Sequence, residues 1–130
     1  MTESLTEPQK WTIARLAYWY LDRRRVQEAE ALARGLIALD NRHGPGWLYY
    51  GEARRQQGDL GGALQGFEQA AQLMADRSDL WMRLGEIQLR LGRGEEARRS
   101  LEKARAIGGD EAVTQRVLAL LGQCKKRVNQ

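Results

Sequence analysis

The sequence contains very little cysteine, histidine or proline: one cysteine, one histidine and two prolines among 130 residues. Because Cys124 stands alone, no disulfide can form within the chain, and a cytoplasmic location is the simplest interpretation. We expect Cys124 to be an ordinary, partly exposed thiol. His43 has no second ligand or catalytic partner near it in the sequence. We therefore expect no catalytic, cofactor-binding or metal-binding residues, and the sequence argues against an enzyme.

Long apolar runs are also missing, since none approaches the ~20 residues that a membrane-spanning helix needs. The N-terminal residues MTESLTEPQK are polar and acidic. We therefore expect no membrane insertion and no secretory signal. With 42% hydrophobic and 29% charged residues, the composition is typical of a folded, helix-rich protein. The length suits a single domain over residues 1–130.

Positive charge is in excess, with a net charge of +4 at pH 7. Basic residues form short runs with glutamates spread among them, at Arg23–Arg25, Arg54–Arg55, Arg98–Arg99 and Lys125–Arg127. We interpret these runs as solvated helix faces and as charges that complement helix C-termini, and we do not expect nucleic acid as a ligand. The alternative is a general assembly scaffold or a nucleic-acid-associated adaptor that uses this arginine-rich surface.

The chain repeats itself after a shift of 34 residues. The shift aligns Trp47 with Trp81, Tyr50 with Leu84, Gly51 with Gly85, Gly58 with Gly92, Ala63 with Ala97, Phe67 with Leu101, and Ala70 with Ala104. Moved back by the same 34 residues, the pattern falls on Ile13, Leu16, Ala17, Tyr20, Arg24, Ala29, Ala33 and Leu36. A first copy is therefore recognisable, although it departs further from the pattern.

A repeat of this length, with an aromatic residue, a large–small pair, a turn and a second helix bearing small residues, resembles the tetratricopeptide repeat. The resemblance implies an all-α fold, a right-handed superhelix of three helical hairpins with a C-terminal capping helix. The repeats would cover about residues 10–43, 44–77 and 78–111, and the capping helix about 110–126. Individual helices are expected at 8–22, 26–39, 45–57, 60–74, 79–91, 94–107 and 110–126.

Most of the glycines have a structural role in this frame. Gly51 and Gly85 lie in the middle of helices, where two helices of one repeat approach closely. Gly58 and Gly92 lie where the first helix of a repeat ends, which favours a left-handed backbone. The frame does not explain Gly61, Gly62 and Gly66, which we interpret as a weak, mobile start to the fourth helix. Helix starts are expected at Thr6 with Pro8, at Pro45, and at the caps Asp59, Ser78 and Asp110.

The resemblance implies that the first helices of the repeats line a groove for another polypeptide. Projection by repeat frame assigns nine residues to this groove: Ala14, Tyr18, Leu21, Leu48, Glu52, Arg55, Met82, Glu86 and Leu89. For Tyr18, Leu21 and Leu48 the alternative is simple burial against neighbouring helices. A clamp for acidic C-terminal tails is not expected, because only one of its matching positions, Arg83, holds a suitable cation. The residues at the matching positions are Ala14, Tyr18, Glu52, Asp79 and Arg83. The expected ligand is an extended or helical client segment with apolar anchors.

The first repeat and the residues that follow it also contain Leu16-Ala17, Tyr20, Ala29, Leu36, Leu39-Asp40, Gly51 and Gly58. In these residues the chain resembles the small tetratricopeptide chaperones of bacterial type III secretion. This resemblance implies a non-enzymatic chaperone that holds a client protein in the cytoplasm, as a homodimer or heterodimer formed through its N-terminal helix region.

Four aromatic residues, Trp11, Tyr18, Trp19 and Tyr20, are crowded into the first helix. One narrow helix stripe cannot bury four large rings, so at least one ring should project outward. Trp11 and Trp19 are therefore predicted to form a dimer or docking surface. The alternative is that the N-terminal arm, with Leu5, folds over them.

Overall fold

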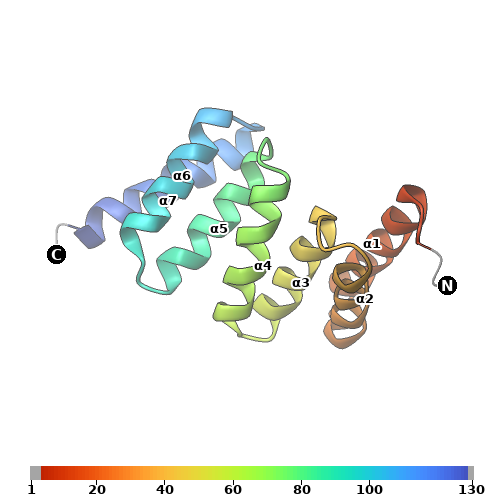
Figure 1. The fold of residues 1–130 in the computed structure, drawn as a ribbon. Coiled ribbons are helices and arrows are strands. Elements are labelled where there is room, and N and C mark those ends of the chain that lie inside the picture. Colours follow the sequence, from red (N-terminus) through yellow and green to blue (C-terminus); the bar gives the residue numbers. More distant parts are fainter. Residues whose placement is uncertain (1–3, 129–130) are drawn as a thin grey trace. The chain divides into compact units, whose positions relative to one another are not determined.

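The structure is a computed structural model that describes residues 4–128. Seven helices and no strands occur in this part of the chain (Figure 1). The helices are α1 (Glu7–Asp22), α2 (Val26–Leu39), α3 (Gly44–Gln56), α4 (Leu60–Leu73), α5 (Ser78–Arg90), α6 (Gly94–Ile107) and α7 (Glu111–Val128). Each expected boundary lies within two residues of the observed one, and the all-α prediction is confirmed.

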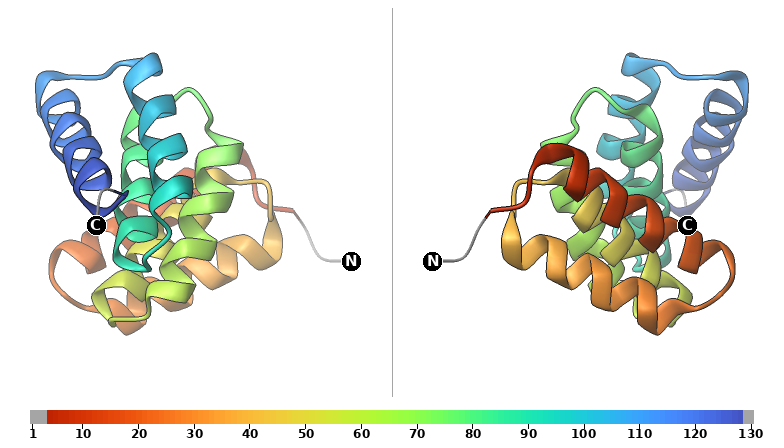
Figure 2. Two further views of the ribbon diagram at one scale, coloured as in Figure 1. Left: turned by 90° about the vertical axis from the view of Figure 1, so that its left-hand side faces the viewer. Right: turned by 90° about the vertical axis from the view of Figure 1, so that its right-hand side faces the viewer.

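The helices belong to two compact units, Met1–Leu73 and Met74–Gln130. In the first unit, α1 pairs with α2 and α3 pairs with α4, while α3 also packs on α2 and α1 (Figure 2). In the second unit, α5 pairs with α6, and α7 packs on both. The first two predicted repeats therefore lie in the first unit, and the third repeat and the predicted capping helix lie in the second.

Most helix starts follow the sequence signals. Thr6 and Gln9 form a reciprocal capping box at the start of α1. The Asp59 carboxylate accepts a hydrogen bond from the backbone N–H of Gly62, and that of Asp110 accepts one from Val113. The prediction that Ser78 caps α5 is wrong: Ser78 is the first residue of the helix and is buried, and the residue before it makes no side-chain cap.

The turn after the first helix of each repeat uses a left-handed backbone. Gly58 and Gly92 have φ angles of 81° and 77°, which confirms the prediction for both. Arg24, which occupies the same place in the first repeat, has a φ of 61°. A side chain in this conformation contacts its own backbone, which is unfavourable by roughly 1–2 kcal/mol. The first repeat thus keeps the turn geometry without the residue that suits it.

We expect Arg24→Gly to raise the free energy of unfolding by about 1 kcal/mol, because glycine removes the strain at a positive φ. Urea denaturation monitored by circular dichroism measures this gain. The neighbouring Arg23 has a φ of −97°, so Arg23→Gly is the matched control and should lower stability instead. An Arg24→Gly variant no more stable than the wild type would contradict the assignment of strain.

Where α3 and α4 approach each other closely in the first unit, glycine lies on both sides. A Cβ atom added at Gly66 would lie 2.6 Å from the Gly51 Cα and 2.8 Å from the Trp47 carbonyl oxygen. The interpretation of Gly66 as part of a weak, mobile helix start is therefore wrong, because Gly66 is buried where α4 touches α3. Gly51 itself contacts the buried ring of Phe67, and a Cβ there would lie 3.1 Å from that ring.

Two tryptophans tie the first helix of a repeat to the segment before it. The Trp47 indole N–H donates a hydrogen bond to the Asn41 carbonyl at 2.8 Å, and that of Trp81 donates to the Ala75 carbonyl at 2.9 Å. Both bonds reach six residues back along the chain. The repeat therefore preserves a specific hydrogen bond as well as an apolar residue.

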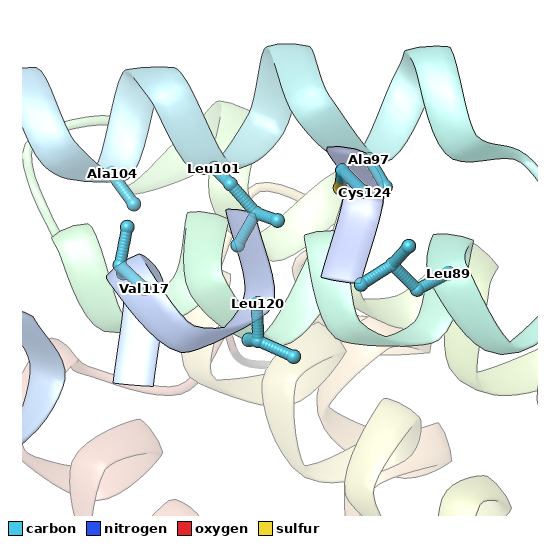
Figure 3. Packing of buried hydrophobic residues seen from close by; sticks show 7 residues of the cluster. All are labelled: Leu89, Ala97, Leu101, Ala104, Val117, Leu120 and Cys124. Atoms are coloured by element: carbon cyan, nitrogen blue, oxygen red, sulfur yellow. The ribbon is translucent and has the colours of Figure 1, made fainter. Parts of the chain in front are cut away.

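In the second unit, α7 covers an apolar cluster made with α5 and α6. Figure 3 shows the labelled side chains of α7 beside those of α5 and α6. The cluster consists of Leu89 from α5, Ala97, Leu101 and Ala104 from α6, and Val117, Leu120 and Cys124 from α7. Cys124 is 1% exposed, so the expectation of a partly exposed thiol is wrong. The thiol follows the apolar stripe of α7 and behaves as a small hydrophobic residue.

Candidate functional site

The residues predicted to line a groove divide into buried and accessible ones. Four are buried: Ala14, Leu21, Leu48 and Leu89. The other five are partly or well exposed: Tyr18, Glu52, Arg55, Met82 and Glu86. For Leu21 and Leu48 the burial agrees with the alternative interpretation. The groove itself stays a prediction. The buried residues could form only the floor of such a groove.

In the first unit, an accessible face joins α1 to α3. Tyr18 is 58% exposed, and its ring centroid lies 6.1 Å from that of Tyr49 on α3. Glu52 follows Tyr49 by three residues and Arg55 follows Glu52 by three, so the three side chains are neighbours along α3. We call these four residues, Tyr18, Tyr49, Glu52 and Arg55, the α1–α3 face. Tyr49 was missed in the sequence, although its spacing from Glu52 could have revealed it.

The polar part of the α1–α3 face is fixed by a charge-assisted pair. The Arg55 guanidinium donates to the Glu52 carboxylate, with an Nη2–Oε2 distance of 2.9 Å and two longer Nε contacts. Both side chains are partly buried, so the pair is held in one geometry beside the tyrosines. The face thus combines two large aromatic surfaces with an ordered ion pair.

In the second unit, α7 already contacts the predicted groove residues of α5. Leu89 is buried in the cluster beneath α7, and Met82 packs against the same cluster. Glu86 accepts a hydrogen bond from Arg116 of α7 at 2.7 Å. α7 packs on α6 and α5 as α3 packs on α2 and α1. It therefore takes the place of the first helix of a further repeat and contacts the same side chains of α5.

The outer side of α1 carries the exposed tryptophans. Trp11 is 49% exposed and Trp19 is 42% exposed, and Leu16 beside them is 43% exposed. The prediction that at least one ring projects outward is confirmed. Leu5 is only partly exposed, yet with residues 4–6 in place both indoles stay accessible. Their role as a dimer or docking surface stays a prediction.

Comparison with known proteins agrees with this architecture. A family model described as tetratricopeptide repeat matches residues 54–124, more than half of the chain. The chain belongs to the tetratricopeptide repeat family. A search of curated proteins found no match.

Solved structures extend the likeness over almost the whole tetratricopeptide repeat chain. The type III secretion translocator chaperone SycD of Yersinia enterocolitica is 18% identical, with a TM-score of 0.88 over 97% of this chain and 90% of that chain. PcrH of Pseudomonas aeruginosa, in complex with the chaperone-binding region of PopD, is 23% identical, with a TM-score of 0.87 over 98% and 99%. The first tetratricopeptide repeat domain of Spaghetti, bound to the HSP90 peptide SRMEEVD, is 13% identical, with a TM-score of 0.86 over 99% and 100%. At these identities the likeness establishes the fold.

The histidine of this tetratricopeptide repeat protein is buried between helices. His43 is 6% exposed and meets the Trp11 ring edge-on, with ring centroids 5.4 Å apart. Burial lowers the pKa of His43; nearby Glu7 and Asp40 oppose this shift and Lys10 adds to it. Lys10 also donates to Asp40 at 2.7 Å, which links α1 to the turn that precedes His43.

We expect the pKa of His43 to lie below 6.5, the ordinary histidine value. The unfolded chain then takes up a proton before the folded chain does, so the free energy of unfolding falls as the pH drops below about 6.5. NMR titration is unambiguous, because the chain has one histidine. Trp11→Ala is the matched variant that opens the site, and it should move the midpoint back toward 6.5. A wild-type midpoint at or above 6.5 would contradict the claim that burial dominates the pKa of His43.

The tetratricopeptide repeat chain also has a polar hollow of about 620 Å³ beside the turn between α1 and α2. Its lining mixes Arg24 and Arg25 with Glu28 and Glu30. The carboxylates oppose phosphate binding at this place. Within residues 4–128, no group of three metal-ligating side chains gathers. None of the described helices is long and apolar enough to cross a membrane.

Proposed function

We propose that the protein is a non-enzymatic, cytoplasmic chaperone that holds a segment of a client polypeptide against the α1–α3 face. Its most specific form would be a type III secretion chaperone. The observation that carries the proposal is the fold shared with SycD and PcrH, which have been solved with a YopD peptide and with the chaperone-binding regions of PopD and PopB.

The chemistry of the α1–α3 face supports a polypeptide ligand. Tyr18 and Tyr49 offer large apolar surfaces with polar tips, which suit side chains of an extended or helical segment. The pair of Glu52 and Arg55 is already ordered, so these two side chains would lose little conformational freedom when a ligand binds. A client segment with apolar anchors and few charges fits this combination best.

The arginine-rich surface supports the alternative of an assembly scaffold or a nucleic-acid-associated adaptor less well. Half of the eight arginines of the first unit form ion pairs with carboxylates of the same unit, namely Arg25, Arg34, Arg54 and Arg55. Paired cations offer less charge to a phosphate backbone. Under the alternative, each tenfold rise in salt concentration would lower the logarithm of the binding constant for duplex DNA by about 0.9 per neutralised phosphate.

Site-specific photo-crosslinking tests the proposal in the cells that make the protein. A photoreactive phenylalanine analogue at position 18 should trap a polypeptide whose cross-linked segment is identified by mass spectrometry. The matched control carries the analogue in place of Arg99, an exposed residue of α6. A synthetic peptide of the trapped segment should then bind the wild type at least about tenfold more tightly than Tyr18→Ala. Equal trapping at both positions would contradict a client site on the α1–α3 face.

A second peptide separates this proposal from recognition of acidic tails. The SRMEEVD peptide is bound by the Spaghetti domain. In this chain the positions that match the acidic-tail clamp in the first unit hold Ala14, Tyr18 and Glu52, and none of them is a cation. Calorimetric titration should therefore show no saturable binding of SRMEEVD, with the Spaghetti domain as positive control. Micromolar binding would overturn the preference for apolar anchors.

A further inference from the structure

Tryptophan and arginine alternate along the outer side of α1. Trp11, Arg15 and Trp19 are spaced four residues apart on α1, and Arg23, the residue that caps its C-terminus, continues this spacing, so the four form a single ridge. All four side chains are exposed. In Figure 2 (right), no other helix of the first unit covers α1 and α2 from the side that faces the viewer. We call these four residues the Trp–Arg row.

The cations of this row have no carboxylate partners in the described part of the chain. Neither Arg15 nor Arg23 forms an ion pair there, whereas most other arginines of the first unit do. The Arg23 guanidinium lies 3.9 Å above the Trp19 ring and donates to the Trp19 carbonyl. It is thereby held beside the indole, with the remaining N–H groups available to a partner.

We propose that the Trp–Arg row docks an acidic amphipathic helix of another protein. An i, i+4 ridge fits between the side-chain rows of a second helix. Apolar side chains of that helix would cover Trp11, Leu16 and Trp19, and its carboxylates would pair with Arg15 and Arg23. Charge complementarity carries the choice of partner, because exposed indoles flanked by unpaired guanidinium groups are matched by apolar residues flanked by carboxylates. The inference concerns a surface other than the α1–α3 face and does not rest on the client proposal.

Other occupants fit the row less well. In a symmetric dimer of this chain the same surface lies on both subunits, so four guanidinium groups would share one interface to which the row contributes no carboxylate. A nucleic acid would stack its bases on the indoles, but Arg23 already covers one face of Trp19. A membrane would have to accept Arg15 between the two tryptophans, in the middle of the apolar area.

Charge-swapped peptides test the proposal on the full chain. The probe is a synthetic amphipathic helical peptide with leucine on one face and glutamate along both edges, and its twin has lysine in place of every glutamate. Tryptophan fluorescence should show saturable binding of the glutamate peptide to the wild type. The double variant Arg15→Glu with Arg23→Glu should bind it at least about tenfold more weakly and should prefer the lysine twin. Far-UV circular dichroism verifies that the helices are retained.

The control variant is Arg99→Glu, which reverses an exposed arginine on α6 and should leave the affinity unchanged. Several results would overturn the proposal. One is equal binding of the two peptides by the wild type, and another is unchanged affinity in the double variant. Preferential, arginine-dependent binding of phosphatidylglycerol vesicles or of a single-stranded oligonucleotide would assign the row to those partners instead. Arginine-dependent self-association in sedimentation would assign it to a second copy.

Discussion

Gly66→Ala is expected to lower the free energy of unfolding by about 3 kcal/mol, because overpacking against rigid neighbours has effects of this size. The added Cβ would lie 2.6 Å from both the Cα and the backbone nitrogen of Gly51. Backbone atoms cannot rotate away as a side chain can, so α3 and α4 would have to separate. Urea denaturation monitored by tryptophan fluorescence and circular dichroism measures the loss.

Gly35→Ala provides the matched control for that substitution. Gly35 also lies within a helix, α2, but nothing lies within 4 Å of a Cβ built on it. Alanine should therefore stabilise the helix by up to about 1 kcal/mol, as expected from helix propensity alone. If the two variants were equally stable, the close contact of Gly66 with Gly51 would not exist in solution.

Leu120→Ala is expected to destabilise the second unit by about 3 kcal/mol, within the usual range for leucine in a well-packed core. Leu120 is 2% exposed and lies in the cluster that α7 closes over α5 and α6. The truncation leaves a cavity and removes apolar contacts from this junction. The change is measured as a shift of the denaturation midpoint, with loss of protection in α7 followed by hydrogen exchange.

Leu118→Ala is the matched control on the same helix. Leu118 is 51% exposed, so its truncation should alter stability by no more than about 0.5 kcal/mol. Both substitutions place alanine in α7 and have the same effect on helix propensity. Comparable losses in the two variants would mean that α7 is not seated on the cluster as described.

The helices could be predicted from the sequence because the repeat fixes their order and spacing. Equivalent places in the two clearest repeats hold the same residue types: Trp47 and Trp81, Gly51 and Gly85, and the turn glycines. Each pair therefore indicates the same local geometry in both repeats. Thr6, Pro45, Asp59 and Asp110 added helix starts that depend on local hydrogen bonding or a fixed φ alone. Such signals can be recognised in the sequence without knowledge of the tertiary structure.

The errors arose where a residue acts through a contact outside its own helix. Gly66 looked like a flexible position because its partner, Gly51, lies on another helix. Cys124 looked exposed because a basic segment follows it, but the period of α7 places it in the core. Ser78 has the chemistry of a cap but is the first residue of α5, since a helix boundary depends on the preceding turn as well.

The candidate site was only partly predictable. Projection by repeat frame selected Tyr18, Glu52 and Arg55, which are accessible in the structure. It could not separate them from Leu21 and Leu48, which are buried, because burial depends on neighbouring helices. It also assigned Met82 and Glu86 to a groove without anticipating their contacts within the second unit. There α7 packs on the cluster that Met82 contacts, and Arg116 pairs with Glu86.

The most direct test of the account is an amide NMR titration of the protein with the client segment recovered by cross-linking. The account predicts saturable shifts that are largest around Tyr18, Tyr49 and Glu52 and that are lost in Tyr18→Ala. Shifts confined to α2 and α4, or binding that Tyr18→Ala leaves intact, would contradict a client site on the α1–α3 face.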